Sequence, residues 1–276
     1  DNQVLIERPT ATGSLDRLYC SQLRLQFHPR IKAGPTRAKP TRQLQLARII
    51  AEGQPVEFHT YKNGQEQIYA NMGTLKYHLE ERMMELIDRV VAATGRRHLV
   101  EVHQGETRLT TGHMLIAMNE KNDVHTVECR GEGRIGPSSR FKKSEGPQKD
   151  VMGATWTNSM LLRRGDEQRI TLNGGARVVQ ASTNDSGKLQ ADLSLSGDTI
   201  EMLFENIAAA TPDSDESLEP QLKTPSASLD MSTIQPRLLV ATGRVDMVSR
   251  DLTGHAREKL SVKFQKTAAP AEATPS

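Results

Sequence analysis

The sequence predicts an all-β protein built from repeated antiparallel units, and three observations support this. Glycines recur at positions 13, 53, 95, 133, 175 and 243, at intervals of 40, 42, 38, 42 and 68 residues. Runs with apolar residues at alternate positions recur between these glycines, and turn-forming segments such as Lys62-Asn63-Gly64 separate the runs. Such self-similarity is typical of stacked or radial repeat architectures, and alternation with period two is typical of strands with one buried face.

The alternating runs predict the inward-facing side chains of the strands. They are Leu23-Leu25-Phe27, Leu75-Tyr77-Leu79, Met114-Ile116-Met118, Trp156-Asn158-Met160, Ile200-Met202-Phe204 and Leu260-Val262-Phe264. The fourth run alone has a polar residue in its middle. The recurring glycines are expected at bends or bulges, where the chain turns a corner and no side chain fits.

Residues 80–93 also fit a helix, but their place in the repeat predicts a strand, because tertiary context overrides propensity. A basic, proline-containing loop is expected over residues 30–42 and a polar loop over 136–150. An acidic insert over 206–236 accounts for the long last glycine interval, and 267–276 form an Ala/Pro linker. Residues 1–266 are therefore interpreted as one repeat array.

Composition excludes some functional classes and leaves others open. The 276 residues carry a formal net charge of +2, too near balance to indicate a nucleic-acid partner by charge alone. The two cysteines, Cys20 and Cys129, are too few for a disulfide scaffold, and we expect both to be small buried apolar residues.

No motif predicts an enzyme. The segment from Gly131 to Gly136 spells G-x-G-x-x-G, but Pro137 follows, so we expect a repeat marker and a turn instead of a helix that would bind a pyrophosphate. His103, His113, His125 and Cys129 lie near one another in the sequence without the spacing of a metal site. Serine, histidine and aspartate residues are present, but none lies in a local sequence motif that would activate a nucleophile. We expect no cofactor and no metal.

Two segments carry a resemblance to a known family. They are LLVATGRVDMVSRDLTGHAREKLSVKF, residues 238–264, and LQLARIIAEGQPVEFHTYKNGQEQIYANMGTLKYHL, residues 44–79. Both resemble OstA-like units, the family that includes the periplasmic lipopolysaccharide-transport protein LptA and the amino-terminal domain of its outer-membrane partner LptD. The family pattern Ala-x-Gly-x-Val matches residues 241–245, and Ala-x-x-Leu-x-Tyr is approximated by residues 70–77 with a short insertion.

The resemblance implies a V-shaped antiparallel β-jellyroll whose two sheets enclose an apolar groove. It implies a non-enzymatic periplasmic protein that binds and conveys lipopolysaccharide or a related glycolipid, and that stacks by its edge strands on other OstA-like proteins. The apolar side chains expected to line this groove are Phe27, Phe58, Tyr77, Met118, Met202, Phe204 and Phe264, with Ile116 left unassigned.

Two other interpretations stay open at this stage. The same alternating residues would simply fill a solid core if the repeats formed a stiff structural rod or a protein-interaction module of the cell envelope. A β-propeller also has a period near 40 residues, but the Gly-His and Trp-Asp signatures of its blades are absent at the repeat positions.

Overall fold

The protein is described here from a computed structural model, in which residues 3–9, 14–32, 41–91, 94–138, 151–165, 167–183, 189–204 and 236–264 are described. These residues form strands and turns and no helix, so this part of the chain has no helix that could span a membrane. The prediction of an all-β, antiparallel chain is confirmed.

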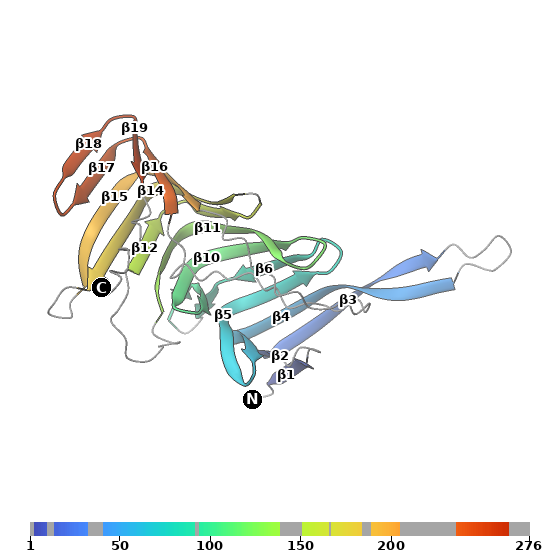
Figure 1. Cartoon of the computed structure of the whole chain (residues 1–276). Helices are drawn as coiled ribbons and strands as arrows, with labels where there is room; N and C mark the ends of the chain where they lie inside the picture. Colours follow the sequence, from blue (N-terminus) through green and yellow to red (C-terminus); the bar gives the residue numbers. More distant parts are fainter. Residues whose placement is uncertain are drawn as a thin grey trace, which may run out of the picture.

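The strands follow the chain from one end of the molecule to the other, as the colours of Figure 1 show. Their bounds are β1 Val4–Pro9, β2 Ser14–Cys20, β3 Gln22–Lys32, β4 Thr41–Lys62, β5 Gln65–His78, β6 Met83–Ile87, β7 Arg89–Val91, β8 Arg96–His98, β9 Val100–Gln104, β10 Thr107–Met118, β11 Val124–Pro137, β12 Val151–Trp156, β13 Ser159–Arg163, β14 Gln168–Thr183, β15 Leu189–Phe204, β16 Pro236–Thr242, β17 Val245–Ser249, β18 Thr253–Ala256 and β19 Lys259–Lys263. Apart from the hairpin of β7 and β8, all of them belong to one continuous antiparallel sheet.

Long strands divide this sheet into two halves. The strands β4, β5, β10, β11, β14 and β15 each pair with different neighbours at their two ends. Sheet half A contains β3, β6, β13, β16 and β19 together with one end of each long strand. Sheet half B contains β1, β2, β9, β12, β17 and β18 together with the opposite ends.

Glycines stand where the long strands pass from one half to the other. The pairing register breaks between Glu52 and Val56 in β4, around Gly53, and between Asn173 and Ala176 in β14, around Gly174 and Gly175. Both glycines of β14 have positive φ, a conformation in which glycine carries no steric cost. The prediction that glycines mark bends is confirmed here, and Gly243, also at positive φ, separates β16 from β17.

The corner of β11 shows why no side chain fits there. A Cβ added at Gly133 would lie 2.3 Å from Cζ2 of Trp156, and the indole Nε1 of Trp156 donates a hydrogen bond to the carbonyl oxygen of Gly131 at 3.0 Å. Gly131 itself has a φ of 82°. The segment that spells G-x-G-x-x-G therefore lies within a bent strand, packed against the only tryptophan.

Several sequence predictions need correction. Gly95 lies in the turn between β7 and β8 and marks no corner, and Gly13 lies outside the described residues. The run through Asn158 is not one strand, since β12 ends at Trp156 and β13 begins at Ser159. In the segment 80–93, by contrast, the predicted strand is confirmed, because a turn leads into β6 and β7, while residues 92 and 93 lie outside the described residues.

Strands extend into both of the loops that the sequence predicted. The segment 30–42 is strand at both ends, because β3 runs to Lys32 and β4 begins at Thr41, while 33–40 lie outside the described residues. Since β11 extends to Pro137, the loop expected over 136–150 begins later, and 139–150 are not described. The insert 206–236, apart from Pro236, and the tail 267–276 also lie outside the described residues.

The hydrophobic core lies between the two sheet halves. Across half A, directly paired residues form a row from Leu25 in β3 to Val262 in β19. Its members are Leu25, Ile49, Tyr77, Met84, Ile116, Val127, Leu162, Ile170, Met202, Leu239 and Val262. The matching row of half B is Leu18, Phe58, Ala70, Val102, Leu109, Ile135, Ala154, Val178, Leu195 and Met247. Buried members of both rows belong to one hydrophobic cluster.

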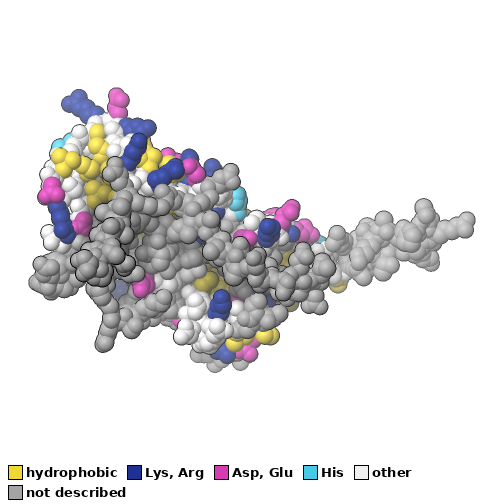
Figure 2. Space-filling model, viewed as in Figure 1, with side chains coloured by type: hydrophobic (Ala, Val, Ile, Leu, Met, Phe, Trp, Pro, Cys, Tyr) yellow, Lys and Arg dark blue, Asp and Glu magenta, His cyan; other side chains and the backbone are white. Residues whose placement is uncertain are grey.

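Both cysteines lie in this core as free thiols, as predicted, with Cys20 1% and Cys129 0% exposed. Burial raises the pKa of the Cys129 thiol far above its usual range, so this thiol stays protonated and unreactive. Outside the core, the face shown in Figure 2 carries apolar surface mixed with charges over the end of the sheet that holds β16 to β19. Val248 and Leu252, from this end, are 51% and 59% exposed.

Candidate functional site

An apolar cavity of about 70 Å³ lies between the two sheet halves, in the part of the molecule formed by β4, β5, β6, β9, β10 and β11. Half B contributes Phe58, Ile68, Ala70, Met72, Val102 and Gln104 to its wall. Half A contributes Leu75, Met84, Leu86, Ile116, Met118, Val124 and Val127. Gln104 is the only polar residue in this set, so the space favours an apolar occupant over water.

The strands place these side chains in layers, from the corner outward. Met72 and Leu75 flank Gly73, at the point where β5 passes between the halves, and they close the inner end of the cavity. Met72 is 1% and Leu75 is 5% exposed. A Cβ at Gly73 would lie 2.5 Å from the carbonyl oxygen of Asp88, so the bend requires glycine.

The cavity is more accessible on the side away from the corner. The lining side chains farthest from the bend are Ile68 and Gln104 from half B and Met118 and Val124 from half A, and all four are partly exposed. Met84 and Ile116, one layer further in, are also partly exposed. The two walls therefore form a groove with a buried inner end and a solvent-accessible mouth.

The structure distributes the predicted groove residues over different environments. Phe58 and Met118 line the cavity, while Tyr77 and Phe264 are partly buried against the hydrophobic core. Met202 and Phe204 are 0% and 1% exposed, in the filled part of the interior. Phe27 is 49% exposed and pairs with Leu46, beyond Arg48, where the pairing of β4 with β5 ends.

Sequence reasoning missed most of the lining residues. Ile68, Ala70 and Met72 of β5 lie on alternate positions of a strand that pairs with both β4 and β9. Their alternation was visible in the sequence, but the width of the space in front of them depends on the distance between the two halves. No local signal reports that distance.

A second cluster occupies the outer face of half B, where three of the four tyrosines surround His59. The ring centroids of Tyr19, Tyr61 and Tyr69 lie 5.4, 6.0 and 5.1 Å from that of His59. This packing leaves the His59 residue only 8% exposed. The covering rings explain how a polar side chain on a solvent-side face becomes buried.

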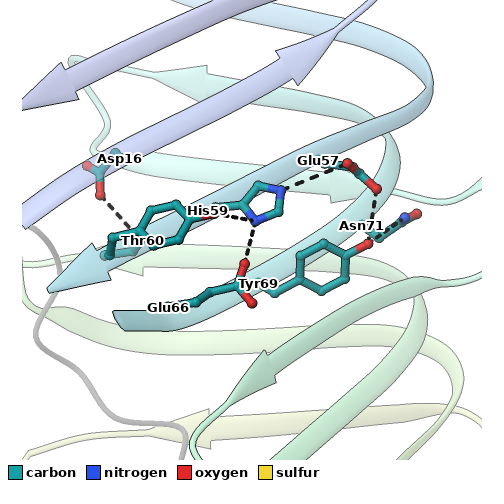
Figure 3. Close-up of polar contacts among 8 residues, drawn as sticks. Asp16, Glu57, His59, Thr60, Glu66, Tyr69 and Asn71 are labelled. Atoms are coloured by element: carbon teal, nitrogen blue, oxygen red, sulfur yellow. Dashed lines mark hydrogen bonds and ion pairs between the residues drawn. The ribbon is translucent and has the colours of Figure 1, made fainter. Parts of the chain in front are cut away.

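Carboxylates flank this histidine, as Figure 3 shows. Nδ1 of His59 lies 2.5 Å from Oε1 of Glu66, and Nε2 lies 3.9 Å from Oε2 of Glu57 without a hydrogen-bond partner. The hydroxyl of Tyr69 donates to Glu57 at 3.2 Å and accepts from Nδ2 of Asn71 at 3.0 Å. The cluster therefore stabilises the outer face of half B.

Nearby, Ser138, His103 and Glu101 form a hydrogen-bonded series. Nδ1 of His103 lies 2.7 Å from the Ser138 hydroxyl, and its Nε2 lies 2.5 Å from Oε1 of Glu101. This order of hydroxyl, imidazole and carboxylate resembles that of a hydrolytic triad. The cavity between the halves and the depression at the corner both lie away from Ser138, so neither provides space for a substrate beside its hydroxyl.

That depression, of about 560 Å³, is polar and open to solvent. It is lined by Ser21, Gln22, Glu52, Gly53, Gln54, Gly73, Thr74, Asp88 and Arg89. Because the depression is lined by both acidic and basic groups, it favours neither an anionic nor a cationic ligand. The cavity between the halves is consequently the stronger candidate for a binding site.

Comparison of the chain with protein-family models, with curated proteins and with solved structures found no match.

Proposed function

We propose that this chain is a non-enzymatic lipid-binding protein of the periplasm, which binds and conveys lipopolysaccharide or a related glycolipid. In this proposal the two sheet halves are the walls of a V-shaped, OstA-like β-jellyroll built from repeats. The observation that carries the proposal is the apolar cavity between the halves, with its buried inner end and accessible mouth. The resemblance of residues 44–79 and 238–264 to OstA-like units supports the same function.

The chemistry of the walls suits acyl chains. Each methylene transferred from water to an apolar environment gains about 0.8 kcal/mol, so even a short length of acyl chain would bind usefully. Met84 and Met118 have flexible, polarizable side chains that adapt to varied shapes. The sugar and phosphate groups of a glycolipid would remain in water outside the mouth.

A cavity of about 70 Å³ is too small for a whole acyl chain. Uptake therefore requires the halves to separate at the mouth, or the two methionines to change rotamer. This gives a passive mechanism, in which the groove shields acyl chains and partner proteins supply direction. The partners we propose are other OstA-like β-jellyrolls, stacked on edge strands such as β3 or β19, whose backbone groups can extend a sheet.

Site-specific photo-crosslinking tests the proposal. A photoreactive amino acid at Ile68 or Met118, at the mouth, should label with a lipopolysaccharide preparation, whereas one at Val248, 51% exposed elsewhere, should not. Unlabelled lipid should compete for labelling. Equal labelling at all three positions, or none at the mouth, would contradict lipid binding in the groove.

A structural rod with a filled core is the second candidate function. The observation that favours it is the row through Leu162, Ile170, Met202 and Leu239, whose members are at most 3% exposed and leave no groove there. Lipid that binds the folded state raises its unfolding free energy by mass action. A rod would show no such dependence on lipid concentration, so thermal unfolding with and without lipopolysaccharide separates the two functions.

A further inference from the structure

The strands β3 and β4 continue past the rest of the sheet as a two-stranded ribbon, which Figure 1 shows projecting from the body. Their pairing extends to Lys32 and Thr41, whereas β5 pairs with β4 only as far as Arg48. We call residues 27–32 and 41–46 the ribbon. Within the described part of the chain, no third strand pairs with it on either side.

One face of the ribbon is apolar and accessible. Residues directly opposite each other in a sheet share a face, and Phe27 pairs with Leu46 while Pro29 pairs with Leu44. Phe27 is 49% and Leu44 is 74% exposed. Leu25, 48% exposed, continues this face toward Ile49 and Tyr77, which belong to the inner row of half A.

The sequence of this region is also strongly basic. Residues 21–51 contain seven Lys and Arg and no Asp or Glu, although the whole chain has a net charge of only +2. The remainder of the chain is therefore net acidic. Arg24 is 60% exposed at the side chain even though it pairs with Glu52. The exposed apolar residues and the excess of positive charge thus occur in the same segment of the sequence.

An isolated two-stranded ribbon is marginally stable in water, so a surface that covers its apolar face would stabilise it. A second copy of the ribbon would bring like charges together. An acidic protein would match the charge but would have to supply a complementary apolar surface as well. An anionic bilayer offers apolar acyl chains directly beneath negative headgroups, which is the arrangement that basic amphipathic elements bind.

We propose that the ribbon docks on the surface of an anionic lipid bilayer. Phe27, Leu44 and Leu25 enter the boundary between headgroups and acyl chains, while the excess of seven positive charges over residues 21–51 attracts the protein to the lipid phosphates. This inference does not rest on the proposed transport function, because it involves neither the cavity nor its lining.

Vesicle flotation with the full chain tests this docking. The protein should float with vesicles of phosphatidylcholine and phosphatidylglycerol, bind phosphatidylcholine alone far less, and dissociate as salt is raised. The double variant F27S/L44S should weaken binding by roughly tenfold or more, since it removes two exposed apolar side chains from the contact. Replacing Arg30 and Lys32 by Gln should weaken it by about fivefold for each charge.

Matched controls lie at the opposite end of the sheet. The double variant V248S/L252S removes two side chains of comparable exposure, 51% and 59%, and R244Q/R257Q removes two exposed charges. Both should bind vesicles as the unmodified protein does, and far-UV circular dichroism should show the same strand content in every variant.

The proposal is overturned if the unmodified protein does not float with anionic vesicles, or if F27S/L44S floats as well as V248S/L252S. It is also overturned if sedimentation shows a lipid-free dimer that F27S/L44S converts to monomer, because the ribbon would then bind a second copy. Lipopolysaccharide crosslinking at Ile68 and Met118 is independent of each of these outcomes. Failure of docking and failure of the transport function can therefore be told apart.

Discussion

Replacing Ala70 by valine should stabilise the protein, because Ala70 faces free space. It lines the cavity from half B between Phe58 and Val102, and it is 4% exposed. Valine adds two carbon atoms, each occupying about as much as the roughly 30 Å³ share of a water molecule in the liquid. The cavity of about 70 Å³ accommodates them.

The expected gain is about 1 kcal/mol. Two buried carbons contribute about 1.6 kcal/mol by transfer, and restriction of the valine rotamers offsets roughly 0.5 kcal/mol of this. Urea unfolding should show a higher midpoint with an unchanged m-value. The same variant should take up less acyl-chain probe, because the added methyl groups occupy the groove.

Ala154→Val is the matched control for this substitution. Ala154 is 5% exposed and occupies the same row of half B, between Ile135 and Val178, but it does not line the cavity. Extra carbons there meet packed neighbours, and overpacking costs about 1–3 kcal/mol. If Ala70→Val loses as much stability as Ala154→Val, there is no usable space at Ala70 and the groove interpretation is refuted.

Three further substitutions test the core, the corner and the electrostatics. Met202→Ala should lower the unfolding free energy by about 2–5 kcal/mol because Met202 is fully buried, whereas Met118→Ala at the mouth should cost under about 1 kcal/mol; equal losses in urea unfolding would contradict a distinction between core and groove. Gly133→Ala should cost about 1–3 kcal/mol and alter the tryptophan fluorescence, since the new Cβ meets Trp156; the matched change Gly136→Ala, with open space around its Cβ, should be nearly neutral. Burial raises the pKa of Glu85, but its contacts with Lys76 at 3.0 Å and His113 at 2.9 Å produce a net lowering. This carboxylate therefore stabilises the fold above its ordinary pKa of 4.5, and the contribution is lost as pH falls through the lowered value. Glu85→Gln should lose under about 1 kcal/mol at neutral pH and converge with the unmodified protein in acid; a constant difference across the titration would refute this.

The sequence predicted the strands better than the space between them. Alternation identified the inward positions of β5, β10, β15 and β19, because a half-buried strand imposes period two on its own residues. Gly53 and Gly175 could be recognised as corners because a sharp bend excludes side chains. Gly95 was wrongly predicted to mark a bend. It lies in the turn between β7 and β8, where its positive φ also favours glycine.

The division between groove and core could not be predicted in the same way. Met118 and Met202 occupy equivalent alternating runs, yet one lines a cavity and the other is fully buried. The difference depends on which side chains of the other sheet half lie opposite each residue. Their distance depends in turn on the bends of all six long strands. The exposure of Phe27 could not be predicted from the sequence either, because it results from β3 and β4 extending beyond the residues that pair with β5.

In the proposed lipid-binding function, the filled and hollow parts of the interior would have different mechanical roles. Toward β12 to β16 the interior is filled by Trp156, Leu172, Met202 and Phe204, which are at most 2% exposed and pack between the two halves. Toward β4 to β6 the cavity is lined in part by Phe58, Met84 and Met118, which are only partly buried. Opening at the mouth therefore breaks few buried contacts, while the packed end keeps the strands in register. A protein that admits an acyl chain needs this asymmetry, because an interior packed equally along its length would have to lose core contacts with every lipid that entered.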